Sequence, residues 1–361
     1  MENKRRILFI SRTMDQGGAE KVVYQLASDL KDRFEYIAVA STGGILGNEL
    51  ATNGIPQIII KDIESKSIST IISNFKILKD VIKKNDINII HSHHRMAAFY
   101  ARALRYVFPS IALIYTAHNS FFDRKLLYNY SLRKTKVISV GQSVKDNLVR
   151  DIGIRENYIV VIPNSVKMNK EENISEDIEL FEEKNHNIVC LARLSEQKGI
   201  KYLIDAMNIV KNEISDIRLF LIGDGEERKQ LEELVSQLEL NETIIFLGYK
   251  KNVIDYIKQS EFIVLSSLWE GFPLTPIETF MMGKTIIATN IPGTNEIVNN
   301  DNGMLVSKKD SLDLAKAINY LIKNPNERIA KEKQALQTYL ENFSYNIFLD
   351  KHEKIYFEDD L

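Results

Sequence analysis

The chain has 361 residues, 44% of them hydrophobic, and its 47 Lys and Arg against 49 Asp and Glu give a net charge of −2, so it can bury two cores of ordinary domain size. No stretch approaches the roughly eighteen consecutive apolar residues of a membrane span. The opening "MENKRRILFIS" has too short an apolar run for a secretory signal, so we expect a cytoplasmic protein.

The charge is distributed unevenly along the chain. Residues 1–166 carry 24 Lys and Arg against 15 Asp and Glu, a balance of +9, and the remainder carries a balance of −11. A basic first half suits an acidic substrate, an anionic membrane face or nucleic acid. No nucleic-acid motif is present, so we expect no nucleic-acid partner.

Short β-branched runs alternate with helical patterns along both halves. The runs predicted to be strands are 6–10, 36–40, 57–60, 87–90, 111–115, 136–140 and 158–162, then 187–192, 217–223, 243–248, 261–266, 284–289 and 303–306. Apolar runs without strict alternation, separated by amphipathic helices such as 21–31 and 313–323, indicate parallel sheets covered on both faces. We therefore predict an α/β protein with two doubly wound domains. The single cysteine, Cys190, lies in one of these runs and is expected to be a core residue.

The strand pattern breaks at residues 167–186, a polar and acidic stretch. We place the domain boundary there, with a first domain at 1–166 and a second at 167–340. Residues 341–361 are expected to form a C-terminal helix that packs back on the first domain. Ligands of such sheets bind beyond the carboxyl ends of the strands, so the loops that follow strands are the candidate sites.

The first such loop, "SRTMDQGGAEKVV", ends in Gly17 and Gly18 and opens into a helix. It is either a tight turn that uses glycine's backbone freedom or a close approach of backbone to a phosphate at a helix N-terminus. It matches neither the G-x-G-x-x-G dinucleotide fingerprint nor the Walker loop.

Histidines follow two further strands of the first half. His91 and His93 would share one face of a strand, which invites a metal hypothesis, but no Cys or acidic cluster completes a ligand shell. We favour packing at the strand tip or lining of the ligand cleft for these two and for His94. His118 ends the next strand, as a structural hydrogen bonder or as a functional group.

The helix predicted after His94 combines cations and aromatic residues. It is either a solvated helix with a core stripe or an interfacial membrane contact. The residues concerned are Arg95, Arg102 and Arg105, with Phe99, Tyr100, Tyr106 and Phe108 among them.

In the second half, "CLARLSEQKGIKYLIDAM" places Arg193 and Lys198 on a loop that leads into a helix. Two cations beside a helix N-terminus suit a diphosphate, although each alone could be a solvated surface charge. The later segment "EGFPLTPIETF" carries Glu270 at the end of a buried strand, where an acid costs desolvation unless something binds it. Glu278 also fits a capping box with Thr275 as N-cap.

These motifs occur together in the order and approximate spacing of a known family: "GGAE", "HSHH", "TAHN", "IPNSV", "ARLSEQKG", "GDG", "EGFPLTPIE" and "PGTNEIV". Over essentially its whole length the chain resembles the retaining glycosyltransferases of family 4, which have the GT-B architecture of two Rossmann-like domains facing a central cleft. The most specific elements are R-x-x-x-x-K-G and the E-x7-E pair.

This resemblance implies roles for side chains. Arg193 and Lys198 would hold the donor diphosphate, Glu270 would lie beside the hydroxyls of the donor sugar, and Glu278 would bind the nucleotide ribose. His118 would sit near the transferring sugar.

The resemblance also implies backbone contacts. Gly17 and Gly18 would form a loop against the donor phosphate and the acceptor, and the segment "LGYKKNV" from Leu247, which contains Gly248, would border the base. Pro273 has no N–H to give, where the family often has Gly. The amides expected to meet the sugar and phosphates are those of Gly271, Phe272, Leu274 and Thr275.

The implied reaction breaks the bond between an anomeric carbon and a nucleoside diphosphate, so the main demand is stabilisation of negative charge on phosphate. The sequence has no D-x-D metal motif, and Arg193, Lys198 and helix dipoles would replace the metal; we expect no metal and no cofactor. The expected donor is a UDP-hexose. The expected acceptor is lipid-linked or a saccharide in surface polysaccharide or glycoconjugate assembly, with reversible association of the basic half with an anionic membrane.

Two alternatives remain open. A sugar-nucleotide epimerase has the same two-domain architecture and would need acid and base groups but no acceptor site. A catalytically silent protein that binds sugar nucleotides as a partner subunit would keep the motifs without turnover.

Overall fold

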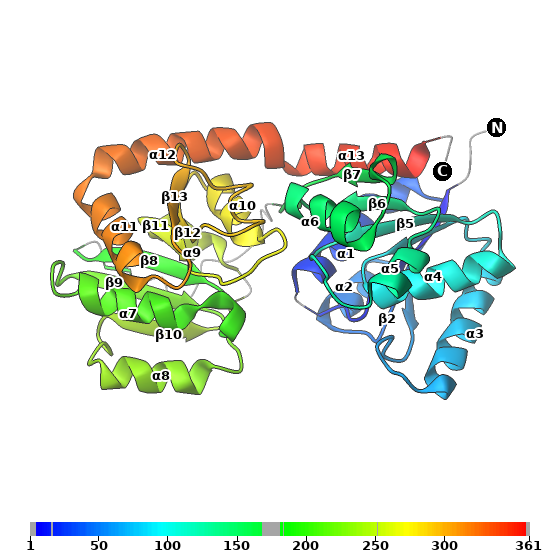
Figure 1. The fold of residues 1–361 in the computed structure, drawn as a ribbon, viewed down its shortest axis with the longest axis horizontal. Coiled ribbons are helices and arrows are strands. Elements are labelled where there is room, and N and C mark those ends of the chain that lie inside the picture. Colours follow the sequence, from blue (N-terminus) through cyan, green and yellow to red (C-terminus); the bar gives the residue numbers. More distant parts are fainter. Residues whose placement is uncertain (1–4, 16, 168–180, 183, 251, 359–361) are drawn as a thin grey trace. The chain divides into compact units, whose positions relative to one another are not determined.

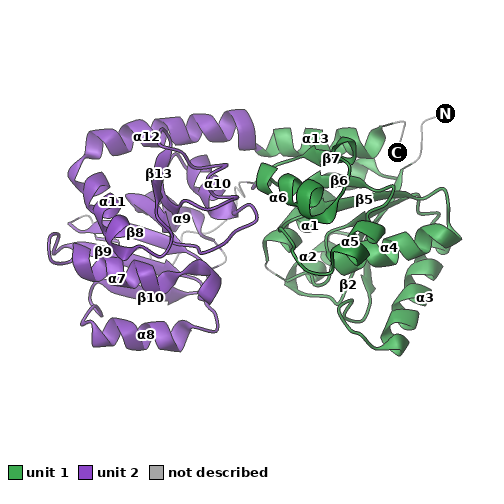
Figure 2. Ribbon diagram, viewed as in Figure 1, with its two compact units in different colours: residues 1–165, 345–361 green, residues 166–344 purple. Residues whose placement is uncertain are grey.

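The computed structural model describes residues 5–15, 17–167, 181–182, 184–250 and 252–358. Most of the stretch expected to link the domains, 168–180 and 183, lies outside the described residues. The chain divides into two compact units (Figure 2): unit 1 is Met1–Ser165 with Tyr345–Leu361, and unit 2 is Val166–Ser344.

Unit 1 contains a seven-stranded parallel sheet in the order β3-β2-β1-β4-β5-β6-β7. The strands are β1 (Arg6–Ile10), β2 (Tyr36–Ser41), β3 (Gln57–Ile59), β4 (Ile89–Ser92), β5 (Ala112–Ala117), β6 (Lys136–Ser139) and β7 (Ile159–Val161). The α-helices (Figure 1) are α1 (Gly18–Asp29), α2 (Ile45–Thr52), α3 (Ile68–Lys84), α4 (Arg95–Val107), α5 (Lys125–Ser131), α6 (Gln142–Asn147) and α13 (Tyr345–Phe357). Helices α1 and α13 share one core with the sheet, and α3 and α4 share another.

Unit 2 repeats this plan with six parallel strands in the order β10-β9-β8-β11-β12-β13. The strands are β8 (His186–Leu191), β9 (Ile217–Ile222), β10 (Ile244–Gly248), β11 (Phe262–Leu265), β12 (Ile286–Thr289) and β13 (Gly303–Val306). The α-helices are α7 (Ile200–Val210), α8 (Arg228–Gln237), α9 (Ile254–Gln259), α10 (Leu274–Met281), α11 (Ser311–Lys323) and α12 (Pro325–Thr338) (Figure 1). Cys190 is buried in the core of this unit.

The predicted fold class is confirmed, since both sheets are parallel and Rossmann-like. In each sheet the chain reverses the direction of strand addition at one point, between β1 and β4 in unit 1 and between β8 and β11 in unit 2. Neighbouring loops diverge at such a switch point, and ligands of this fold bind there, just beyond the carboxyl ends of the strands.

The last helix, α13, is held on unit 1 by buried and polar contacts. Tyr356 is fully buried and its hydroxyl lies 2.7 Å from Nδ1 of His91. The hydroxyl of Tyr345 donates to Oδ2 of Asp29 at 2.6 Å, and Phe348 is buried in the same core. Among the described residues, no helix has the length and apolarity needed to cross a bilayer.

Candidate functional site

The loops that follow β8 and β11 are joined at the switch point of unit 2. The amide of Leu268 donates to the carbonyl of Gln197 at 2.7 Å, and Oγ of Ser266 donates to the carbonyl of Lys198 at 2.9 Å. Gly199 has φ of 59°, and a Cβ there would lie 2.5 Å from the carbonyl oxygen of Ser266. Only glycine permits this approach, so the two loops form one frame.

Lys198 and Glu270, predicted to bind different parts of the donor, contact each other in this frame. Nζ of Lys198 lies 2.5 Å from Oε1 of Glu270, and the two side chains are 18% and 7% exposed. Oγ of Ser267 donates to the same oxygen at 2.7 Å, and Nε2 of Gln197 donates to Oε2 at 3.4 Å. The burial of the carboxylate is thus offset within the protein, whereas the sequence pattern alone pointed to a ligand. The pairing joins residues 72 positions apart, and no local pattern specifies it.

Arg193, the second predicted phosphate ligand, is exposed on the loop after β8. The "GDG" turn, which reads from sequence only as a β-α connection, supports that loop. Gly223 has φ of 138°, and a Cβ there would lie 2.0 Å from the carbonyl oxygen of Ala192. The amide of Leu194 donates to the carbonyl of Asp224 at 3.0 Å. The turn therefore fixes the backbone on both sides of Arg193.

The capping-box alternative for Glu278 is wrong. Helix α10 begins at Leu274 with Pro273 as N-cap, so Thr275 lies within the first turn. The Thr275 hydroxyl donates to the carbonyl of Leu191 at 3.3 Å and is therefore engaged with the end of β8. Glu278 is half-buried one turn further along α10.

The remaining predicted backbone ligands surround the start of α10 or end a neighbouring strand. Gly271 lies against Gly293 of "PGTNEIV", where a Cβ would approach the Gly271 carbonyl oxygen to 2.3 Å. The ring of Phe272 is buried near Phe343, with centroids 6.0 Å apart. Gly248 ends β10, and its carbonyl accepts from the amide of Gly223 at 2.8 Å; Lys251, in the segment expected to border the base, lies outside the described residues.

In unit 1, Gly17 is the N-cap of α1 and Gly18 is its first residue. The carboxylate of Glu20 fills the space beside Gly17, since a Cβ at Gly17 would lie 2.3 Å from Glu20 Oε2. Oγ1 of Thr13 donates to the other oxygen of Glu20 at 2.7 Å. This acid already interacts with the amino end of α1, where the sequence suggested a phosphate.

Histidines at the carboxyl ends of β4 and β5 form a chain in which His91 and His93 are buried and His118 is half-buried. Nδ1 of His93 and Nε2 of His118 lie 3.0 Å apart, and their rings stack with centroids at 5.3 Å. Burial lowers the pKa of His118 to about 3 and holds the pKa of His93 well below its usual value, so both rings are neutral. The two nitrogens of His91 contact the hydroxyls of Tyr356 and Thr116.

These contacts bear on the metal hypothesis for the histidines. Both nitrogens of His91 are already engaged by protein groups, and Nδ1 of His94 accepts from the amide of Met96 at 3.1 Å as the N-cap of α4. Within the described ranges, no group of three or more His, Cys, Asp or Glu has the geometry to hold a metal ion.

Comparisons with known proteins cover both units. Residues 16–170 match the family model described as Glycosyltransferase Family 4, and residues 171–338 match Glycosyl transferases group 1. An uncharacterized glycosyltransferase of Methanocaldococcus jannaschii is 31% identical over 275 residues, 73% of each chain. The UDP-Gal:alpha-D-GlcNAc-diphosphoundecaprenol alpha-1,3-galactosyltransferase of Escherichia coli is 25% identical over 316 residues, 81% of this chain and 80% of the relative.

A solved structure shows the same fold. HepE of Anabaena, in complex with UDP-glucose, superimposes with a TM-score of 0.84 at 21% identity. The superposition covers 97% of this chain and 98% of HepE.

Proposed function

The chain belongs to the group 1 glycosyltransferases of family 4, with the GT-B fold, and from this premise we propose that it is a retaining hexosyltransferase. Its proposed donor is a UDP-hexose, and its proposed acceptor is a hydroxyl of a lipid-linked saccharide or growing glycan. The UDP-glucose complex of HepE and the UDP-Gal donor named for the E. coli relative support the donor class. The undecaprenol-linked acceptor in that relative's name supports the acceptor class.

The pair formed by Lys198 and Glu270 is the observation that carries the proposal. In the structure the ammonium of Lys198 and the carboxylate of Glu270 neutralise each other at 2.5 Å. A donor diphosphate supplies new oxygens for Lys198 and for the exposed Arg193, and the freed carboxylate of Glu270 then accepts from hydroxyls of the sugar. Binding therefore exchanges an internal ion pair for two ligand contacts at the switch point.

In the proposed reaction, the bond between the anomeric carbon and the phosphate oxygen breaks, and its electron pair stays on UDP. The acceptor oxygen bonds to the same face of the sugar, and its proton passes to a phosphate oxygen. Lys198 and Arg193 stabilise the developing phosphate charge. We assign Glu278 to the ribose, His118 to the transferring sugar, and Gly17 and Gly18 to phosphate and acceptor contacts.

Incubation with UDP- and GDP-hexoses and a lipid-diphosphate saccharide tests the function. We expect transfer of the sugar to the acceptor with retention of the anomeric configuration. NMR of the product measures that configuration. Interconversion of free sugar nucleotides without an acceptor would identify an epimerase. Binding without any turnover would identify a silent partner subunit.

A further inference from the structure

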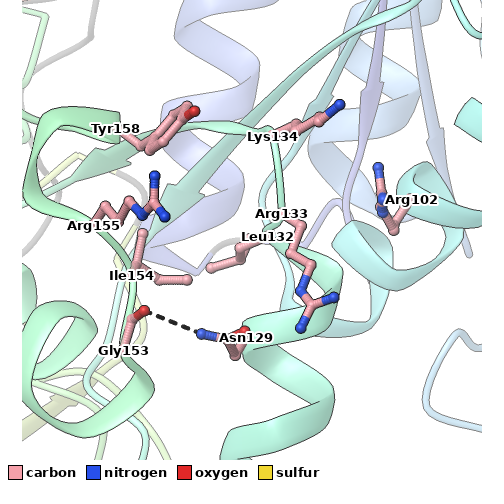
Figure 3. Close-up of a pocket in the computed structure, with 9 residues that line it drawn as sticks. All are labelled: Arg102, Asn129, Leu132, Arg133, Lys134, Gly153, Ile154, Arg155 and Tyr158. Carbon is pink, nitrogen blue, oxygen red and sulfur yellow. Dashed lines mark hydrogen bonds between the residues drawn. The ribbon is translucent and has the colours of Figure 1, made fainter.

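A basic cavity of about 570 Å³ lies in unit 1, away from the strand-end loops described above. Its walls come from α4, the end of α5, and the segments that lead into β6 and β7 (Figure 3). These segments meet the sheet at the amino ends of the strands, whereas His93 and His118 follow carboxyl ends. The cavity therefore lies at the amino ends of the strands, opposite the loops that follow their carboxyl ends. Its volume is in the range of small-molecule sites.

The cavity is lined by four cations and no acid: Arg102, Arg133, Lys134 and Arg155. In the part of the chain that the structure describes, none of the four is within ion-pair distance of a carboxylate. Cations nearby do pair, as Lys125 does with Asp151 at 3.2 Å. The cavity thus holds positive charge that no described side chain balances.

Aromatic side chains hold two of the cations in place. The guanidinium of Arg102 lies 5.0 Å from the ring of Tyr106 and 5.8 Å from that of Tyr130, and Arg133 lies 5.6 Å from the Tyr130 ring. The two tyrosine hydroxyls are hydrogen bonded at 2.7 Å. Nε of Arg102 is buried and has no acceptor among the described residues. Arg102 and Arg133 are therefore positioned by these rings before any ligand arrives.

The far wall is also fixed by hydrogen bonds. Nδ2 of Asn129 donates to the carbonyl of Gly153 at 3.1 Å (Figure 3). The same nitrogen donates to the carbonyl of Ile152 at 2.9 Å. Gly153 has φ of 79°, a backbone conformation that residues other than glycine rarely adopt. Arg155 and Tyr158 follow directly on this anchored turn.

We propose that this cavity is a second anion site, which binds a phosphate ester through Arg102, Arg133 and Arg155. Guanidinium groups match phosphate oxygens with paired, charge-assisted hydrogen bonds, and the negative charge of a diphosphate or a phosphodiester offsets part of the positive charge of the cavity. The ester belongs either to a soluble phosphorylated compound or to the headgroup of an anionic phospholipid. The proposal does not depend on the transferase reaction.

Hydrogen exchange of segments 129–135 and 152–158 tests the proposal with two probes. The probes are inorganic pyrophosphate and phosphatidylglycerol vesicles, with phosphatidylcholine vesicles as the neutral reference. Pyrophosphate that binds to the donor loops of unit 2 would slow exchange in those loops and not in segments 129–135 and 152–158, so the two sites are distinguished. We expect slower exchange around the cavity; protection by pyrophosphate identifies a soluble ligand, and protection by phosphatidylglycerol alone identifies a headgroup.

The double variant Arg133→Glu with Arg155→Glu should need a probe concentration roughly tenfold higher or more to reach the same protection. Lys76→Glu with Lys79→Glu, two exposed sites on α3, makes the same change in charge elsewhere in unit 1 and should leave the protection intact. An equal loss of protection in the two double variants would show an effect of net charge only and would contradict the proposal. If neither probe protects these segments, the proposed site does not exist.

Discussion

Glu270 accepts hydrogen bonds from three side chains, so substitutions at this position differ in which of these contacts they remove. Glu270→Ala leaves the ammonium of Lys198, which is 18% exposed, without its partner. We expect this variant to lose roughly 1–3 kcal/mol of unfolding free energy. Glu270→Gln keeps the shape and the contacts of Oε1 as an acceptor, and should unfold close to the wild-type midpoint.

Turnover should fall roughly 100-fold or more in both Glu270 variants, because the donor sugar loses the charged carboxylate that orients it. Thermal unfolding and donor-consumption rates measured on the same samples separate stability from function. A Glu270→Gln enzyme with wild-type turnover would show that the carboxylate serves the fold alone.

The orphaned nitrogen of His93 predicts the tautomer of His118. Nε2 of His93 is buried without a partner, and a buried N–H without an acceptor is rarer than a buried lone pair without a donor. The shared hydrogen therefore belongs to Nδ1 of His93, and Nε2 of His118 accepts it. Neutral His118 then carries its own hydrogen on Nδ1, which could be donated to the sugar in the role that we propose for this residue.

Nitrogen-15 NMR of histidine-labelled protein at pH 7 reads this tautomer directly. We expect His118 with a protonated Nδ1, and we expect His93→Phe to release that preference. A protonated Nε2 on His118 in the wild type would reverse the assignment.

At the scale of elements, α13 is attached to unit 1 through neutral histidines. Burial lowers the pKa of His352 to about 4 and that of His118 to about 3, and holds the pKa values of His91 and His93 well below the usual 6.5. At a pH between the folded and the unfolded pKa of such a histidine, the ring is protonated in the unfolded chain and neutral in the folded chain. Stability is therefore full above about pH 6.5 and falls on acidification, by up to about 1.4 kcal/mol per pH unit for each group.

Hydrogen exchange of α13, corrected for the intrinsic rate, should accelerate between pH 7 and pH 5. Helix α11 of unit 2 is the internal reference. Replacement of His352 by Gln should make the change shallower. An α13 that exchanges at the same corrected rate at both pH values would show that these histidines do not control its attachment.

Sequence patterns predict elements well here, and long-range partners poorly. Every predicted strand run is a strand, because runs buried on both faces must be continuously apolar. The capping pattern predicts the start of α10 two residues late, since the Thr275 hydroxyl contacts Leu191, far away in sequence. The pairing of Lys198 with Glu270 and the contact of His91 with Tyr356 likewise depend on strand order, which composition and periodicity do not encode.

At the scale of the whole molecule, the proposed scheme uses side chains of the protein, and no metal ion, to stabilise the negative charge that develops on the phosphate. The sequence lacks D-x-D, and Arg193 and Lys198 follow β8 where the family holds the diphosphate. We expect activity to survive EDTA. Turnover that disappears on chelation and returns with Mn²⁺ or Mg²⁺ would contradict the metal-free scheme.

The central claim is that the joined loops after β8 and β11 hold the donor diphosphate, and the affinities of UDP and uridine test it most directly. Titration calorimetry should show that Lys198→Met lowers the affinity for UDP roughly 10- to 100-fold and leaves uridine binding unchanged, because only the diphosphate contacts are lost. Lys201→Met, at an exposed position on α7, should behave as the wild type. A Lys198→Met protein that binds UDP as tightly as the wild type does would contradict the account.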